Sequence, residues 1–259
     1  MLKSFLIAVS LLVPFHANAD EVAVDTVELP EPSVVLKIAN AGDPSAQRLL
    51  GRMYYHGEGL EQDYSSALKW FRKAAQQGDA GAQAALGSMY FNGAGVPQDY
   101  LQSYEWRRKA ASQGDISAQR ALAGMYFLGT GVAKDDSEAL KWFLEAAEQG
   151  DPEAQTFLGD MYLKGRGAAQ DYAKSAEWYR KAAEQGNARA QSVLGAMYYK
   201  GFGVPKDYVQ AHLWLNLAAA GGDSEAKNAR EELAAMMTPS DIAKAQKRAS
   251  EWFAANQPD

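Results

Sequence analysis

Few residues of this chain have side chains that could do chemistry. The 259 residues include 3 His and no Cys, which excludes a thiolate nucleophile, a disulfide framework and a cysteine-ligated zinc site. Ser66 and Lys69 match the motif S-x-x-K, in which the serine is a nucleophile. His16 lies in a segment that we expect to be removed, so His56 and His212 are left for a catalytic triad or a metal site. Two histidines argue against a multi-histidine metal cluster.

Composition narrows the class of protein further. The formal net charge is −6, and the sequence pI is about 5.2. Broad binding to a phosphate backbone needs a basic face, so we expect no nucleic-acid partner. The hydrophobic fraction of 47% is enough for a core and too high for a disordered chain.

The N-terminal residues 1–19 are predicted to be a cleaved secretory signal peptide. Lys3 supplies a positive charge, residues 5–13 form an apolar run too short to span a bilayer, and Ala17-Asn18-Ala19 is an A-x-A cleavage site. We therefore expect an exported protein, periplasmic or secreted, in preference to a membrane-anchored one. Residues 20–32 are acidic, contain two prolines and have no helical period, so they are predicted to be a flexible leader.

One unit of 36 residues is repeated five times without an insertion. Alignment on an alanine divides the array into residues 46–81, 82–117, 118–153, 154–189 and 190–225. Three further positions carry the same residue in every unit: Tyr54, Tyr90, Tyr126, Tyr162 and Tyr198; Trp70, Trp106, Trp142, Trp178 and Trp214; and Met53, Met89, Met125, Met161 and Met197. Because such units bury their core against their neighbours, the period predicts a solenoid.

Each unit is predicted to contain two helices. In the first helix, Ala46, Leu50 and Met53 share one face. A G-x-G pair then ends the helix, because glycine tolerates the left-handed conformation common at helix C-termini. Asp63 and its equivalents can cap the second helix. Gly87 and its equivalents lie within the first helix, where glycine costs about 1 kcal/mol relative to alanine, so we expect a closely approaching helix there.

Capping signals also mark the ends of these helices. Three residues after the capping aspartate, Gln102, Glu138 and Gln210 are predicted to complete a capping box in three of the units. Residues 33–45 are predicted to form an N-terminal half-repeat cap, because residues 36–43 match the end of a unit. Residues 226–259 are predicted to form closing helices, with Thr238 as an N-cap. Both ends of a solenoid need such covers. Leu217 occupies a position that is lysine in other units, so we expect it to face the closing helices.

The repeat resembles the Sel-one-like repeat (SLR), a relative of the tetratricopeptide repeat. In one unit the pattern is carried by Ala82-Gln83, Leu86-Gly87, Met89-Tyr90, Gly93, Gly95-Val96, Asp99-Tyr100, Trp106, Ala110-Ala111 and Gly114-Asp115. The resemblance covers residues 46–225. It implies an all-α, right-handed superhelical α/α solenoid of five helix-turn-helix repeats with capping helices. It also implies an adaptor or regulator in envelope signalling, secretion or complex assembly.

The inner, concave face of such a solenoid is the predicted binding surface. At 100° per residue, one position of the first helix points away from the core, and it holds Tyr55, Phe91, Phe127, Leu163 and Tyr199. Solenoids hold peptides or partner proteins on concave surfaces, and aromatic side chains are frequent anchors. The alternative is that these rings fold over the following G-x-G loop and serve stacking.

Polar residues that vary from unit to unit surround this apolar position, as partner selectivity would require. They are Arg48, Arg52, Asn92, Arg120, Asp160, Lys164 and Lys200.

The remaining candidates have simpler explanations. The methionine position lies on the core face, so we interpret it as core packing and not as a soft-metal site. His56 and His212 are predicted to lie at the surface. S-x-x-K is the signature of penicillin-recognising enzymes, but S-D-N and K-T-G do not occur in this sequence. Equivalent positions of the next units hold Gln102/Glu105 and Glu138/Lys141.

The sequence therefore predicts an exported, non-enzymatic scaffold that binds a protein or peptide, without a cofactor or a metal. A monomer is favoured, with no membrane span in the mature chain. One alternative is a cell-wall or polysaccharide-binding module, in which the aromatic positions stack on sugar rings. A remote alternative is a penicillin-binding or β-lactamase-like enzyme, which depends on S-x-x-K alone.

Overall fold

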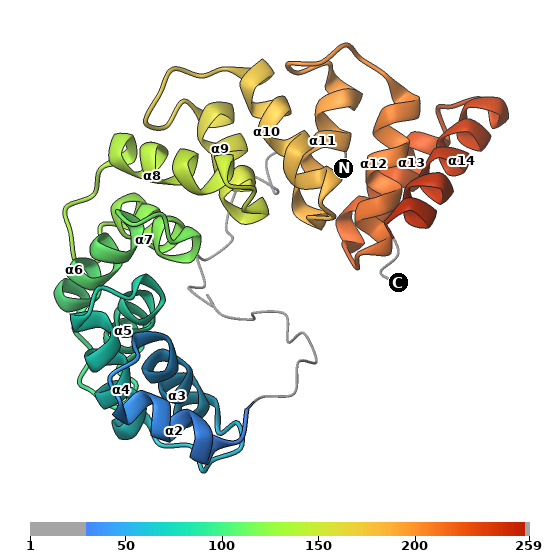
Figure 1. The fold of residues 1–259 in the computed structure, drawn as a ribbon. Helices are drawn as coiled ribbons and strands as arrows, with labels where there is room; N and C mark the ends of the chain where they lie inside the picture. Colours follow the sequence, from blue (N-terminus) through green and yellow to red (C-terminus); the bar gives the residue numbers. More distant parts are fainter. Residues whose placement is uncertain (1–29, 257–259) are drawn as a thin grey trace. The chain divides into compact units, whose positions relative to one another are not determined.

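The computed structural model describes residues 30–256, and in that range the chain is built of helices without a strand. The described chain divides at residue 146 into two compact units, each of which is described by itself. Figure 1 shows that consecutive helices within each unit lie as antiparallel pairs. The signal peptide predicted for residues 1–19 and most of the predicted leader lie outside the described residues.

The helices follow one another in a regular order (Figure 1). The first unit contains α2 (Pro32–Asn40), α3 (Pro44–His56), α4 (Tyr64–Gln76), α5 (Ala80–Asn92), α6 (Tyr100–Ala111) and α7 (Ile116–Leu128). It also contains most of α8 (Asp136–Glu148), which crosses the boundary at residue 146. The second unit contains α9 (Pro152–Lys164), α10 (Tyr172–Glu184), α11 (Ala188–Lys200), α12 (Tyr208–Ala220), α13 (Ser224–Ala234) and α14 (Pro239–Ala255). The predicted pair of helices is thus present in every repeat.

The predicted helix ends are confirmed, except for the capping box. Asp99 accepts hydrogen bonds from the backbone N–H groups of Leu101 and Gln102, and Gly93 ends the preceding helix in the left-handed region at φ 71°. The capping box predicted for Gln102, Glu138 and Gln210 is wrong. The backbone N–H of Asp99, which the box would use, donates to the carbonyl of Tyr90 at 2.9 Å. Asp135 and Asp207 repeat this contact with the first helices of their own repeats.

Small residues bring the two helices of a repeat together. A Cβ added to Gly51 would lie 2.7 Å from the ring of Phe71, and one added to Gly159 would lie 2.8 Å from the ring of Tyr179. This confirms the predicted close approach. The partner is an aromatic side chain of the second helix at these two glycines, whereas Gly87 approaches Arg107 and Gly195 approaches Leu215. The five methionines of the repeated position are buried, with at most 1% of each exposed, as predicted for a core position.

The C-terminal helices cover the last repeat. Leu217, 2% exposed, lies in one apolar cluster with Ala249 of α14, and Trp252 packs against that cluster. Thr238 caps α14 by accepting a hydrogen bond from the N–H of Asp241 at 3.2 Å. Both contacts agree with the expectations for the closing helices. Between residues 30 and 256, no helix has the length and apolar character needed to cross a bilayer.

Candidate binding surface

The aromatic residues predicted to line the binding surface are half-buried and paired. In the first unit, the ring of Tyr55 at the end of α3 lies 5.1 Å from that of Tyr64, the first residue of α4. Phe91 and Tyr100 form the equivalent pair, also at 5.1 Å and with the same interplanar angle of 60°. Each pair therefore joins the end of a first helix to the start of the second helix across the G-x-G loop.

The second unit contains another such pair, and the two remaining members of the predicted surface pack differently. Tyr199 stacks on the ring of Tyr208 at 5.7 Å. Phe127 lies edge-on to the buried ring of Phe143 at 6.5 Å. Its second helix begins with an aspartate in place of the tyrosine. Leu163 packs partly buried against the apolar cluster of α10 to α12. The five positions are thus equivalent in the repeat but present different surfaces.

A tyrosine at the start of the second helix is the part of this surface that sequence reasoning missed. Tyr64, Tyr100 and Tyr172 are 38–39% exposed, and Tyr172 also stacks on Phe202 at 5.1 Å. The recurring dipeptide Asp-Tyr was the available signal. Capping explains its aspartate, whereas the tyrosine ring faces the loop region.

Backbone packing between repeats positions these tyrosines. A Cβ added to Gly95, the second glycine of its G-x-G loop, would lie 2.7 Å from the carbonyl oxygen of Tyr64 in the preceding repeat. Gly131 and Gly203 approach Tyr100 and Tyr172 in the same way. The loop of each of these repeats therefore rests on the first turn of the preceding second helix, which holds the aromatic pair at this edge.

Charged side chains predicted to flank the aromatic surface lie at several sites. Arg48 forms an ion pair at 3.0 Å with Asp79, which caps the following helix α5, and Arg52 pairs with Glu58 at 3.3 Å. The ammonium of Lys200 lies 5.4 Å from the centre of the Tyr199 ring. Asn92 and Lys164 are exposed, and Arg120 is half-buried.

Asp160 does not lie on this surface, contrary to expectation. It is 7% exposed, accepts a hydrogen bond from the hydroxyl of Tyr179 at 2.7 Å and forms an ion pair with Arg189. The position of Asp160 on α9 faces the second helix of its own repeat, so a hydrogen-bonded carboxylate is accommodated there. Burial raises the pKa of Tyr179, and the negative charge of Asp160 raises it further. The tyrosine therefore remains a hydroxyl donor at neutral pH.

The residues that suggested catalysis have other contacts. The hydroxyl of Ser66 donates to Oδ2 of Asp63 at 2.6 Å, and this hydrogen bond lowers the pKa of the Asp63 carboxyl. Helix capping therefore accounts for Ser66, while Lys69 is exposed. No group of three or more His, Asp or Glu among residues 30–256 is arranged to hold a metal ion.

The two histidines have different environments. His56 is exposed, as predicted. The surface position predicted for His212 is wrong, because it is 3% exposed on α12, which packs against both α13 and α14. Burial lowers the pKa of His212, and the nearby charge of Arg230 lowers it further.

Comparison with known proteins agrees with this architecture. A family model described as the Sel1 repeat matches residues 44–79, 80–115, 116–151, 152–187 and 188–223. A crystal structure of a Sel1 repeat protein from Oxalobacter formigenes is 39% identical over 78% of this chain, with a TM-score of 0.72. A second is c5321, a protective antigen of uropathogenic Escherichia coli with an SLR fold, which is 32% identical over 86% of this chain, with a TM-score of 0.57.

The present chain spans 58% of the first of these proteins and 56% of the second. A search among curated proteins found no match. Sel1 repeat proteins generally mediate protein–protein interaction, and the repeat is generally a non-enzymatic scaffold. The five matched repeats, the paired helices and the two related structures together establish an α/α solenoid, and the chain belongs to the Sel1 repeat family.

Proposed function

We propose that this protein is an exported, non-catalytic adaptor that binds a protein or peptide partner through the inner face of its first helices. The observation that carries the proposal is the recurrence of aromatic pairs at one edge of successive repeats, each made of a half-buried ring and an exposed tyrosine. Tyr55 with Tyr64 and Phe91 with Tyr100 have the same ring separation and tilt. A regularly spaced series of this kind fits an extended partner.

The chemistry of these rings favours binding to a polypeptide. Aromatic side chains supply large contact areas and lose little conformational entropy, especially when a neighbouring ring already holds them. The exposed part of each ring is apolar surface whose removal from water would stabilise a complex. Leu101, which is 59% exposed beside Tyr100, adds to this apolar surface.

Charged residues around the rings provide a basis for selectivity. The pair between Arg48 and Asp79 has no equivalent of the same charges in the next repeat, where Ala84 occupies the position of Arg48. Lys206 lies between Tyr199 and Tyr208, 6.0 and 4.9 Å from the ring centres. Different charges beside a repeated apolar position discriminate partners by attraction and by repulsion.

A capture experiment tests the proposal. Tyr55→Ala, Phe91→Ala and Phe127→Ala are combined in one variant, and proteins retained from an envelope extract are compared with those retained by the wild type. We expect loss of the specifically captured protein. A control variant combines Lys69→Ala, Gln76→Ala and Glu145→Ala, exposed positions of second helices, and should retain it.

Because the three rings are half-buried, unfolding midpoints must first show that both variants are folded. A second variant, Tyr64→Ser with Tyr100→Ser, changes more exposed members of the same pairs. A folded triple variant that keeps every protein partner would contradict the proposal. Alkaline phosphatase is active only when it is exported, so a fusion of residues 1–32 to this enzyme that stays inactive in cells would contradict export.

A polysaccharide ligand is the second candidate, and one observation favours it. Tyr172 and Phe202 are stacked with an interplanar angle of 19°, and each is 38% exposed. Flat, exposed ring faces suit contact with sugar rings. Retention of the pure protein on peptidoglycan, lost in Tyr172→Ser, would support this function in place of the adaptor function.

A further inference from the structure

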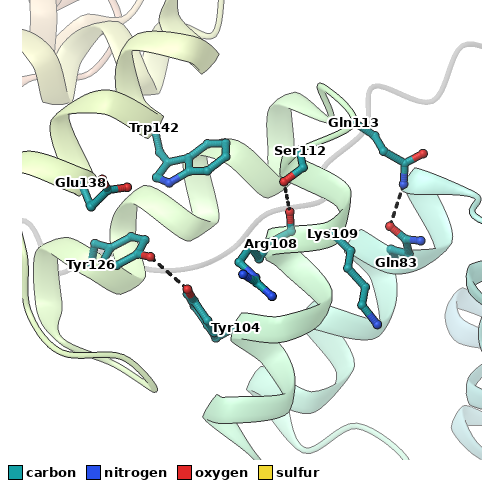
Figure 2. A pocket seen from close by; sticks show the side chains of 9 residues that line it. All are labelled: Gln83, Tyr104, Arg108, Lys109, Ser112, Gln113, Tyr126, Glu138 and Trp142. Atoms are coloured by element: carbon teal, nitrogen blue, oxygen red, sulfur yellow. Dashed lines mark hydrogen bonds between the residues drawn. The ribbon is translucent and has the colours of Figure 1, made fainter.

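An open groove in the first unit lies between the second helices of two neighbouring repeats. It encloses about 600 Å³ and is lined by side chains of α5, α6, α7 and α8. Figure 2 shows Tyr104 and Arg108 of α6 beside Tyr126 of α7 and Trp142 of α8, with Lys109 of α6 further along the groove near Gln83. None of these residues belongs to the aromatic surface described above.

In two other repeats a hydrogen bond spans the equivalent place. The guanidinium of Arg72 donates to the hydroxyl of Tyr90 at 2.7 Å, and that of Arg180 donates to the hydroxyl of Tyr198 at the same distance. An arginine of the second helix thus fastens to the repeated tyrosine of the next repeat. Arg108 occupies the position of these arginines, and Tyr126 is its tyrosine.

A single residue changes this arrangement. Tyr104 stands where the first repeat has the buried Leu68, and its hydroxyl lies 3.0 Å from the hydroxyl of Tyr126. The two rings also meet edge to face at 5.9 Å. Tyr104 therefore makes the hydrogen bond that the arginine makes in those repeats, and the guanidinium of Arg108 lies 5.9 Å from the centre of the Tyr104 ring.

Hydrogen-bond donors collect in the groove as a result. The side chain of Arg108 is 54% exposed and pairs at 3.2 Å with Glu105, one turn away on the same helix. Within the tyrosine pair, one hydroxyl donates to the other, so the second proton is left to donate to a further acceptor. Burial raises the pKa of Tyr126 above that of an ordinary tyrosine, as does the hydrogen bond with Tyr104, so this pair stays protonated.

Three further side chains that line the groove determine its charge and its apolar surface. Lys109 contributes a second cation, which lies over the ring of Trp106 at 4.2 Å. Trp142 supplies an apolar wall, in line with its partial burial. The carboxylate of the groove, Glu138, pairs with Lys141 at 3.4 Å, which offsets its charge. The groove thus combines donors for one carboxylate with an apolar surface next to them.

We propose that this groove binds an acidic peptide segment of a partner protein, with a carboxylate on Arg108 and Lys109 and a neighbouring apolar side chain on Trp142. An arginine and a carboxylate form a strong, charge-assisted hydrogen bond. A partner that contacts the aromatic surface through other residues would gain a second, independent attachment here.

A fluorescence-anisotropy titration tests this site. The probe is the fluorescein-labelled peptide Gly-Glu-Leu-Glu-Pro-Gly, compared with a peptide in which glutamine replaces both glutamates. We expect saturable binding of the acidic peptide and at least about tenfold weaker binding of the neutral one, because a hydrogen bond to a charged group is lost. Arg108→Gln should weaken binding of the acidic peptide to the same extent.

Two further variants separate this site from general surface charge. Tyr104→Leu restores the residue of the first repeat, so the guanidinium of Arg108 should donate to the hydroxyl of Tyr126. Binding of the acidic peptide should then be lost while the protein remains folded. Arg72→Gln removes an equally placed arginine that already has a tyrosine partner, and should leave peptide binding unchanged. Equal binding of the two peptides, no saturable binding, or full retention by Arg108→Gln or Tyr104→Leu would overturn the proposal. Displacement by millimolar inorganic phosphate alone would show an unspecific anion site and would also overturn it.

Discussion

The side chain of Gln83 donates a hydrogen bond to the backbone carbonyl of Ala75 at 3.2 Å, across the junction between one repeat and the next. The carbonyl of Ala75 lies in the last turn of α4 and also accepts from the backbone N–H of Gly78 at 3.1 Å, so Gln83 supplies its second hydrogen bond. Its own Oε1 accepts from Gln113 at 2.8 Å. The same contact is made by the other glutamines of the Ala-Gln pair: Gln47, Gln119, Gln155 and Gln191.

Replacing this glutamine should destabilise the fold. Gln83→Leu keeps the volume of the side chain but leaves the carbonyl of Ala75 and the amide of Gln113 without this partner. We expect a loss of about 0.5–1.5 kcal/mol in the free energy of unfolding, measured by urea denaturation followed by circular dichroism, because the carbonyl keeps its hydrogen bond from Gly78. Gln102→Leu, at an exposed position, is the control and should change stability little. Equal effects of the two substitutions would contradict a role for the buried hydrogen bond.

The close approach of the helices predicts opposite outcomes for two glycines. Gly159→Ala places a Cβ 2.8 Å from the buried ring of Tyr179, which cannot move away, so we expect destabilisation of about 1–3 kcal/mol despite the better helix propensity of alanine. Gly81→Ala meets the partly exposed side chain of Arg48, which can move, and should be neutral or slightly stabilising. Thermal unfolding measures both. A neutral Gly159→Ala would show that the helices can separate at no cost.

Burial of His212 predicts acid sensitivity near neutral pH. The pKa of His212 is lowered from its ordinary value of 6.5, so the unfolded chain binds the proton more tightly than the folded one. The stability that depends on neutral His212 is complete above about pH 7 and is lost as the pH falls below the ordinary value. We expect the temperature of the unfolding midpoint to decrease as the pH is lowered from about 7.5 to about 5.

His212→Leu tests the origin of this pH dependence. Leu68 and Leu140 occupy the same position of other repeats, so leucine suits the site. The variant should lose much of the fall in midpoint over this pH range. Asp63 and Asp241 have lowered pKa values and are expected to affect stability only at more acidic pH, because they lose their charge below their ordinary values. Parallel pH profiles of the wild type and the variant would exclude His212 as the cause.

Local interactions explain why most of the fold could be predicted from the amino-acid sequence. Asp99 caps a helix through N–H groups two and three residues away, and Gly93 ends one through its own positive φ. Such features depend on neighbours in the chain and on a period of 3.6 residues, both of which are visible in the sequence. Five repetitions of one pattern then identify the faces that pack together, which is how the methionine and glycine positions were placed correctly.

Which polar residues are buried and which lie at the surface depends on contacts between helices that no local sequence pattern contains. His212 is buried because α13 and α14 follow the last repeat, and Asp160 is buried because Tyr179 and Arg189 supply its partners.

The sequence by itself determined the repeat, its helices and its core, because these follow from spacing along the chain. Only the tertiary structure decided which polar groups are buried, where tyrosine pairs form and where Arg108 faces an open groove. Those features depend on which side chains from separate helices meet in space. The position that holds Leu68 in the first repeat holds Tyr104 in the second, and this one difference changes the hydrogen bonds of the neighbouring arginine and tyrosine.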